Sequence, residues 1–131
     1  MERKIINPWG WQDALGFVQA NRISGHQRLL VCAGQTAMDA DGRPVHAGDM
    51  RAQVAYVMDN LQTVLDQAGH TLAEVMQLKY YTTDVAAFFD AYDIVTTRLE
   101  AAGCRPAATL LGVRELAFPE LMIEIEALAI A

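Results

Sequence analysis

The sequence has little cationic character and contains no run of basic residues. Ten Lys and Arg stand against sixteen Asp and Glu, so the formal net charge is −6 at pH 7. Because nucleic-acid binding requires a clustered cationic surface, this balance argues against a nucleic-acid partner. No apolar stretch has membrane-spanning length, and residues 1–4 lead into Asn7-Pro8 rather than into a signal-peptide core. We therefore expect a soluble, cytoplasmic protein without a membrane partner.

Patterns that hold metals or phosphates are also missing. The three histidines, His26, His46 and His70, lie in or beside expected turns without ligand spacing to one another or to a cysteine. We expect them at the surface and expect no metal site. No Gly-rich phosphate loop is present, and no cofactor is expected. Cys32 and Cys104 are far apart in sequence and predict reduced thiols, with Cys104 as a buried structural thiol.

What the sequence does contain is enough apolar material for one well-packed domain. The chain has 131 residues, of which 53% are hydrophobic and 20% are charged. This length predicts a single domain over residues 1–131 with a sizeable core. The apolar fraction is high for a small monomer, which has few places to bury it, and this favours an oligomer.

Two segments have the apolar spacing of amphipathic helices. Residues 49–68 and 85–102 each place their apolar residues at steps of three and four, which gives one apolar stripe per helix. Asp49 is the expected N-cap of the first helix, and Gly69 and Gly103 are expected to end the two helices.

Short apolar segments between turn residues predict strands around these helices. Residues 1–15, with Pro8 and Gly10, favour a turn, and residues 24–27 favour a hairpin turn. The expected strands cover residues 16–23, 28–35, 75–83, 107–116 and 121–130. The predicted order is β-β-α-β-α-β-β. Since each helix has one apolar stripe, both should lie on one face of a single mixed sheet, in an α+β fold. The opposite face then has no cover from its own chain.

The last strand carries two acids on one face. Alternation places Glu124 and Glu126 on the same side, among apolar residues, and Ile123 and Ile125 on the other. In one interpretation both acids reach solvent at a sheet margin or pair with basic residues. In the other, a second subunit covers this face. In that case we expect desolvation to raise the pKa of Glu124, and we expect Glu126 to be more solvated or paired with a basic residue.

Five short segments, spread in order along almost the whole chain, together resemble the RidA (YjgF) family. They are Ala33-Gly34-Gln35, Asp59-Asn60-Leu61, Tyr81-Thr82-Thr83-Asp84, Arg105-Pro106-Ala107 and Glu124-Ile125-Glu126-Ala127. The resemblance implies a chorismate-mutase-like fold and a homotrimer whose sheets form a central barrel. It also implies small-molecule clefts between the subunits and no metal or cofactor.

Members of that family hydrolyse reactive imines and enamines and release ammonia. The resemblance implies that an arginine directly after Pro-Ala holds the substrate carboxylate, and this sequence has Ala108 there. Arg105 cannot replace it, because an odd shift along the strand points to the opposite sheet face. The site residues implied by the resemblance are Glu124 as the catalytic group, with Phe17, Ala33, Gly34, Tyr92, Ala108 and Thr109 at the ligand. Compared with the family pattern, the cleft loses its cation and two hydroxyl groups and keeps its acid.

These departures lead to three functional hypotheses. The first is a homotrimer whose cleft binds or hydrolyses a cationic or neutral ligand and which is not a competent 2-imino acid deaminase. The second is an imine or enamine deaminase in which Glu124 positions water. The third is a regulatory or structural trimer that binds a protein. The family has also been described as ribonucleases or translation inhibitors, but the net charge of −6 makes RNA binding the least supported of these functions.

Overall fold

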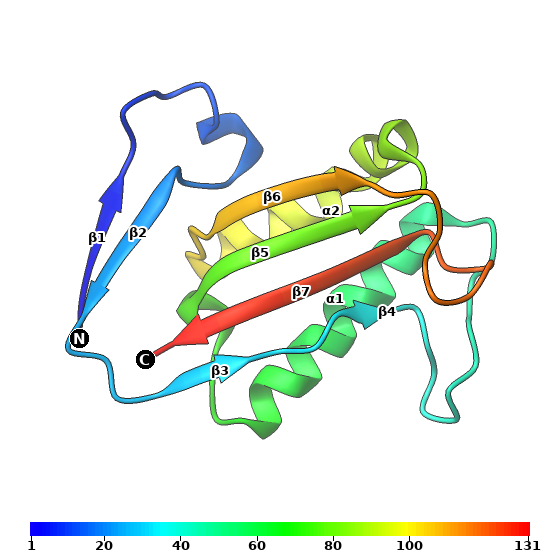
Figure 1. The fold of residues 1–131 in the computed structure, drawn as a ribbon, viewed down its shortest axis with the longest axis horizontal. Helices are drawn as coiled ribbons and strands as arrows, with labels where there is room; N and C mark the ends of the chain where they lie inside the picture. The colour runs from blue at the N-terminus through cyan, green and yellow to red at the C-terminus, as the bar shows by residue number, and fades with distance from the viewer.

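The computed structural model describes residues 1–131 (Figure 1). In chain order the strands and α-helices are β1 (Glu2–Ile6), β2 (Ala20–Ser24), β3 (Leu29–Val31), β4 (Gln35–Thr36), α1 (Met50–Gln67), β5 (Val75–Thr82), α2 (Val85–Ala102), β6 (Ala107–Gly112) and β7 (Ile123–Ile130). Two short 3₁₀ helices, Asp13–Leu15 and Leu72–Glu74, precede β2 and β5.

Both helices form where their sequence patterns predicted them. The Asp49 carboxylate accepts the backbone N–H of Ala52 at 3.0 Å, which confirms it as the N-cap of α1. Asp84 does the same for α2, accepting the N–H of Ala87 at 3.0 Å. At the other end, Gly103 follows α2 with a φ of 66°, a left-handed conformation that glycine adopts without strain.

The main sheet is mixed and has its longest strands at its centre. Its strand order is β3-β7-β5-β6, and the short β4 pairs with β7 on the same side as β3 (Figure 1). Only the pairing of β5 with β6 is parallel, because α2 connects these two strands. The sheet therefore has β3 and β4 along one edge and β6 along the other.

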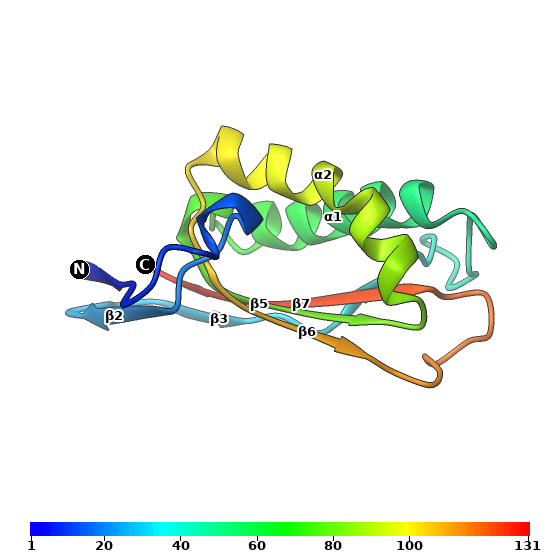
Figure 2. The same cartoon turned by 90° about the horizontal axis from the view of Figure 1, so that it is seen from above.

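Both helices cover the same face of this sheet, as predicted (Figure 2). Along β7 the residues alternate between buried and half-buried, with Ile123 and Ile125 fully buried beneath the helices. Helix residues such as Leu61 and Val95 are also fully buried in this core. Each such aliphatic side chain contributes about 1.5–3 kcal/mol by leaving water. The α+β fold class is confirmed.

The N-terminal part differs from the prediction. Residues 2–6 form β1 rather than a turn, and β1 pairs with β2 in a separate two-stranded sheet. Gly25 does turn the chain, with a φ of 68°, but the strands on its two sides do not pair with each other. Instead, β3 pairs with β7, and the N–H groups of Gln27 and Arg28 donate to the Ala131 carbonyl at 2.9 and 2.8 Å. The predicted hairpin was therefore wrong, because β2 pairs with β1 and β3 pairs with β7 instead of with each other.

Three predicted strands are shorter than expected. The strand predicted over residues 16–23 begins only at Ala20, and the one predicted over 107–116 ends at Gly112. The strand predicted over 28–35 divides into β3 and β4. Between them the backbone passes so close to Glu124 that a Cβ at Gly34 would lie 2.7 Å from the Glu124 carboxyl carbon. A residue with a side chain at position 34 would therefore collide with the Glu124 carboxyl group.

Two further observations concern expectations from composition. No helix in the structure combines the length and the apolar character that crossing a membrane requires.

His26 and His46 are exposed, as predicted, but His70 is buried. The surface prediction for His70 was wrong because its Nδ1 lies 2.7 Å from the Glu74 carboxylate, which satisfies the ring inside the fold. This local pair stabilises the turn between α1 and β5.

Candidate functional site

Within this chain the predicted site residues lie on opposite faces of the sheet. Ala108 is the register partner of Leu78, which is buried in the core beneath the helices. Glu124 is the register partner of Tyr81, and both point to the open face. One chain therefore brings together two groups of predicted residues, and each group has its own surroundings. Phe17, Tyr92 and Ala108 form one group, and Gly34 and Glu124 form the other, with the exposed Ala33 next to Gly34. Thr109 is the register partner of Lys79, so its side chain lies on the open face although the residue borders the pocket of the first group.

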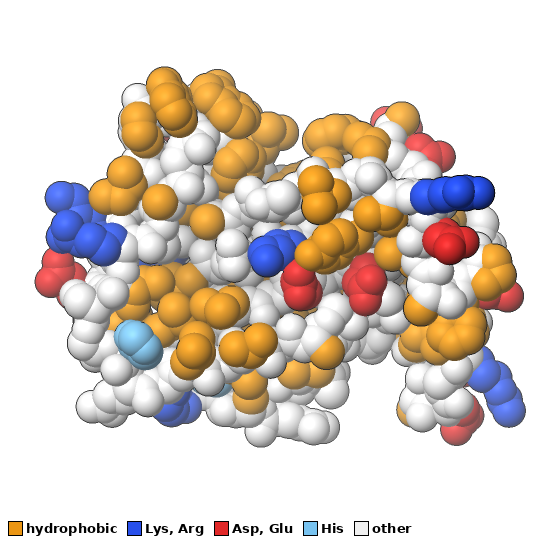
Figure 3. All heavy atoms as spheres, in the orientation of Figure 1, with side chains coloured by type: hydrophobic (Ala, Val, Ile, Leu, Met, Phe, Trp, Pro, Cys, Tyr) orange, Lys and Arg blue, Asp and Glu red, His pale blue; other side chains and the backbone are white.

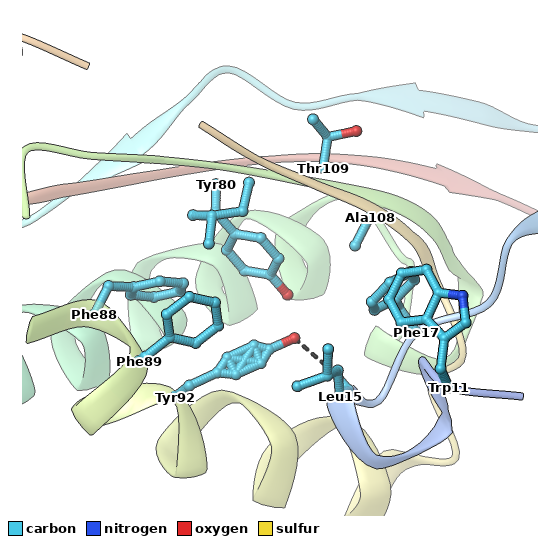
Figure 4. Close-up of a pocket in the computed structure, with 10 residues that line it drawn as sticks. Trp11, Leu15, Phe17, Tyr80, Phe88, Phe89, Tyr92, Ala108 and Thr109 are labelled. Carbon is cyan, nitrogen blue, oxygen red and sulfur yellow. Dashed lines mark hydrogen bonds between the residues drawn. The ribbon is translucent and has the colours of Figure 1, made fainter. Parts of the chain in front are cut away.

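The first group lines a pocket between β6, α2 and the N-terminal segment (Figure 4). The pocket has a volume of about 200 Å³. It is lined by Trp11, Leu15, Phe17, Tyr80, Phe88, Phe89, Tyr92, Ala108, Thr109 and Leu110. None of these side chains is charged, and six are aromatic. Such a pocket favours an apolar or flat ligand and opposes a charged one.

Edge-to-face contacts hold the aromatic side chains of the pocket in place. The ring centroids of Phe88 and Tyr92 are 5.5 Å apart, and those of Trp11 and Phe17 are 5.9 Å apart, both in T-shaped arrangements. The Tyr92 hydroxyl donates to the Leu15 carbonyl at 2.7 Å and so fastens the N-terminal segment to α2 (Figure 4). The pocket is thus fixed by contacts between parts of the chain that are far apart in sequence.

One polar atom inside this pocket has no partner. Tyr80 is only 2% exposed, and its hydroxyl makes no hydrogen bond. The hydroxyls of Tyr80 and Tyr92 point toward one another, but hydrogen-bond geometry is not met between them (Figure 4). Burial, followed by the neighbouring Tyr92, raises the pKa of Tyr80 well above its usual range, so its hydroxyl stays protonated at neutral pH.

Arg105 does not supply the pocket with a cation. It lies outside the set of lining residues and is exposed, with its guanidinium 3.8 Å from the Asp13 carboxylate. Within this chain, Arg105 therefore does not reach the pocket that Ala108 lines. A carboxylate-bearing ligand would therefore enter the pocket without an opposite charge to receive it.

The second group lies on the open face of the sheet. Loss of water raises the pKa of Glu124, and the nearby Glu126 raises it further, as the sequence predicted. Glu126 instead accepts a hydrogen bond from the Tyr81 hydroxyl and lies 3.9 Å from the Lys79 ammonium. The prediction that Glu126 pairs with a basic residue is confirmed. The two acids have different surroundings although they share a face.

Apolar side chains surround these acids on the same face (Figure 3). Val31 is 71% exposed and Leu29 is 56% exposed on the edge strand β3, while Leu111 is 49% exposed on β6. Leu128 and Ile130 on β7 are half-buried. A contiguous apolar surface of this kind on a small protein indicates a contact with another molecule.

Sequence reasoning missed several lining residues of the pocket. Trp11, Phe88 and Phe89 line it although no sequence motif marked them as site residues. Tyr80 could have been found, because alternation along β5 places it on the same face as Leu78. Cys104 is buried, as predicted, and its pKa is raised to about 12 by burial, which makes it a poor nucleophile.

Together the fold and the site define a small α+β protein with two helices on one sheet face and a ligand-sized pocket at the sheet edge. Residues 12–131 match the sequence profile of the family described as Endoribonuclease L-PSP. A solved structure from Yersinia pestis, a protein of unknown function in the conserved Rid family, is 37% identical. It has a TM-score of 0.87, and the similarity covers 98% of both chains. The chain belongs to the RidA (YjgF) family.

Two further relatives show the breadth of the similarity. A RutC family protein of Pyrococcus horikoshii is 28% identical over 101 residues, which cover 77% of this chain and 78% of that protein. The structure of Escherichia coli TdcF with bound serine is 19% identical, with a TM-score of 0.71 over 88% of this chain and 87% of that chain. The second likeness concerns the fold alone.

Proposed function

We propose that this protein is a homotrimer that binds a small, neutral or cationic molecule in clefts between its subunits, and that it is not a competent 2-imino acid deaminase. The observation that carries this proposal is Ala108 in a pocket that has no cationic side chain. Compared with a pocket that has an arginine at position 108, a bound carboxylate lacks a charge-assisted hydrogen bond worth about 1.5–3 kcal/mol. Substrate affinity for a 2-imino acid falls accordingly.

The position of the two half-sites supports assembly. Ala108 lies on the edge strand β6, whereas Gly34 lies beside the opposite edge, between β3 and β4. Head-to-tail contacts around a rotation axis bring one edge of each subunit to the other edge of its neighbour. In such a ring the acid side of one subunit approaches the aromatic pocket of the next. The same ring covers the apolar open face.

Glu124 supplies the carboxyl group that can exchange a proton with a ligand or water in the assembled cleft. Its raised pKa moves it toward the range in which a carboxyl group can both accept and donate a proton near neutral pH. Its neighbour Gly34 has no side chain, so the carboxyl group can face a ligand. Glu124 therefore positions a bound water or a cationic group of the ligand.

This same acid favours the alternative function, an imine or enamine deaminase in which Glu124 positions the attacking water. TdcF, a relative in fold, has been solved with bound serine, an amino acid that carries a carboxylate. In this chain a carboxylate-bearing substrate would have to be held by backbone N–H groups, because position 108 is alanine. A regulatory trimer that binds a protein is a third function, and no observation favours it over the other two.

Two measurements test the proposal: the rate of 2-iminopropionate hydrolysis and the mass of the protein in solution. We expect no meaningful acceleration of pyruvate release when the protein is added to a serine or threonine dehydratase, and a mass of about three times 14.4 kDa by sedimentation equilibrium. A rate within tenfold of an arginine-containing family member would show that the carboxylate argument is wrong. A monomeric mass would remove the cleft between subunits.

A further inference from the structure

The inner surface of the pocket between β6, α2 and the N-terminal segment is almost entirely apolar. The Tyr80 hydroxyl has less than 1 Å² of accessible surface and points toward the Tyr92 hydroxyl, so a ligand cannot reach it (Figure 4). The Tyr92 hydroxyl in turn donates its proton to the Leu15 carbonyl at 2.7 Å. Thr109 borders the pocket, but its side chain lies on the open face of the sheet with that of Lys79. The pocket can therefore recognise an occupant only by its shape and its apolar surface.

Aromatic rings that contact one another form the walls of this pocket. The ring centroids of Tyr80 and Phe88 are 5.4 Å apart, and those of Phe89 and Tyr92 are 6.3 Å apart. Phe17 lies across from them, on the segment that precedes β2 (Figure 4). A flat ring between these walls gains edge and face contacts beyond the burial of its area. The walls therefore favour an aromatic ring over a saturated ring of the same size.

The size and the mouth of the pocket fit one ring with one polar substituent. A cavity of about 150 Å³ lined by aliphatic and aromatic side chains is known to bind benzene, and the volume here is about 200 Å³. Trp11 and Phe89 are 65% and 51% exposed, so the pocket opens to solvent beside them. The indole nitrogen of Trp11 points away from the other rings (Figure 4). A ring can thus enter with its apolar end first and keep a polar substituent hydrated at the mouth.

We propose that this pocket takes the aromatic ring of an uncharged, single-ring compound, with the apolar end of the ligand buried and its polar substituent at the mouth. The buried end makes no hydrogen bond with the protein. The inference rests on the small-molecule function proposed above and names the ligand class of the pocket. The competing occupant is an apolar side chain of a neighbouring subunit, which would leave no room for a ring.

Three uncharged probes of similar size test this ligand class. p-Cresol has one apolar and one polar end on a flat ring, hydroquinone has a hydroxyl at both ends, and 4-methylcyclohexanol carries the substituents of p-cresol on a saturated ring. We expect p-cresol to bind most tightly. Hydroquinone should bind at least about fivefold more weakly, because one of its hydroxyls would be buried without a partner. 4-Methylcyclohexanol should bind about two- to tenfold more weakly, because it lacks the contacts between aromatic rings.

Binding is followed by NMR through the indole N–H signals of the two tryptophans. Trp11 lines the pocket, so its signal should shift when a ring enters. Trp9 is 60% exposed, similar to Trp11, but lies outside the pocket and serves as the internal control. A shift confined to Trp11 therefore reports the pocket rather than contact with exposed indoles in general.

Matched variants place the ring in the pocket. Ala108→Leu fills the pocket from β6 and should abolish the shift that p-cresol causes at Trp11. Ala101→Leu makes the same change at an exposed position of α2 and should leave that shift unaffected. Tyr80→Phe removes a hydroxyl that a ligand cannot reach, so the affinities for all three probes should stay unchanged.

Several results would overturn the inference. Hydroquinone or 4-methylcyclohexanol binding as tightly as p-cresol would contradict the ligand class, and weaker p-cresol binding in Tyr80→Phe would contradict recognition by shape. Unchanged binding in Ala108→Leu, or equal shifts of Trp9 and Trp11, would place the probes outside the pocket. If p-cresol causes no shift at Trp11, the pocket is filled by a neighbouring subunit and takes no ring. The deaminase and sedimentation assays are independent of these readouts, so failure of this inference remains distinguishable from failure of the proposed function.

Discussion

The carboxyl group of Glu124 fills the space beside Gly34 that a side chain at that position would need. A Cβ at residue 34 would lie 2.7 Å from Cδ and 2.9 Å from Cγ of Glu124, closer than such atoms approach in real structures. The residue at position 34 therefore controls the position of the Glu124 carboxyl group. Glu124 is the acid of the candidate cleft whose pKa is raised. The glycine is required by this close approach.

Gly34→Ala should displace the Glu124 side chain. The neighbour that must move is flexible, so we expect a modest loss of about 1–2 kcal/mol in the free energy of unfolding. The Glu124 carboxyl signal in a ¹³C NMR titration should shift at the same time. As the control, Gly48→Ala changes a glycine with open space around it but with a φ of 78°, so it should affect stability through backbone strain and leave the Glu124 signal unmoved. An unchanged Glu124 signal in Gly34→Ala would refute the placement.

Glu124→Gln and Glu126→Gln should have opposite effects on stability. The pKa of Glu124 is raised in the folded protein, so the folded state binds its proton more tightly than the unfolded state. As the pH rises above about 4.3, the ordinary pKa of a glutamate side chain, ionisation of Glu124 therefore lowers the free energy of unfolding progressively. The Glu124→Gln variant should gain stability relative to the parent over that range, at fixed protein concentration.

Glu126→Gln serves as the matched comparison. It weakens the contacts of Glu126 with the Tyr81 hydroxyl and the Lys79 ammonium, and it should lower stability by about 0.5–1.5 kcal/mol near neutral pH. The measurement is thermal and denaturant unfolding from pH 4 to 8, together with ligand response. Loss of ligand response in Glu124→Gln with the trimer intact supports its role in the cleft. Dissociation of Glu124→Gln without a separate functional effect would instead make it an interface residue.

The elements of this fold whose ends are set by residues nearby in sequence could be predicted from the sequence. Helix α2 has the predicted bounds because Asp84 and Gly103 mark its two ends locally. Pairing between distant segments could not be predicted in this way. Nothing near β1 in sequence indicates that its partner is β2, or that β3 pairs with β7 at the other end of the chain.

The same distinction applies to the site. The surroundings of Glu124 followed from alternation along one strand. The aromatic pocket did not, because it exists only where the segment that contains Trp11 and Phe17 folds over α2. The resemblance to the family implied a cleft between subunits with Phe17, Tyr92, Ala108 and Glu124, but it did not indicate that Ala108 and Glu124 lie on opposite faces of the sheet.

Gln53 joins the loops that precede α1 and β7. This fully buried side chain donates to the Val45, His46 and Glu120 carbonyls at 3.2, 3.3 and 2.8 Å. Its amide oxygen accepts the backbone N–H of Met122 at 2.8 Å, two residues before Glu124. It therefore fixes the start of the strand that carries the acid.

Gln53→Leu should be strongly destabilising. It leaves the Met122 N–H and the Glu120 carbonyl without their partner inside the protein, and we expect a loss of about 2–4 kcal/mol in the free energy of unfolding. Gln67→Leu, at the exposed end of α1, makes the same chemical change and should shift stability by less than about 0.5 kcal/mol. Chemical denaturation of both variants measures the difference. Similar values for the two would contradict the role assigned to Gln53.

Ala108→Arg should restore part of the family's hydrolytic activity. The side chain at position 108 points into the aromatic pocket, where a guanidinium could hold a substrate carboxylate through two parallel hydrogen bonds. If Glu124 of a neighbouring subunit is already placed correctly, 2-iminopropionate hydrolysis should rise by at least about tenfold over the parent, which corresponds to about 1.4 kcal/mol of transition-state stabilisation. Phe17, which offers no hydroxyl, and Ala33 limit the gain.

Two further variants at position 108 separate charge from bulk. Ala108→Lys adds the same charge without the planar fork, so its gain should be smaller than that of arginine. Ala108→Met adds comparable length without charge and should give no activity. Equal activity in the arginine and lysine variants would show that only net charge matters. If Ala108→Arg folds as a trimer and remains inactive, position 108 lies out of reach of Glu124, and the two half-sites do not meet between subunits.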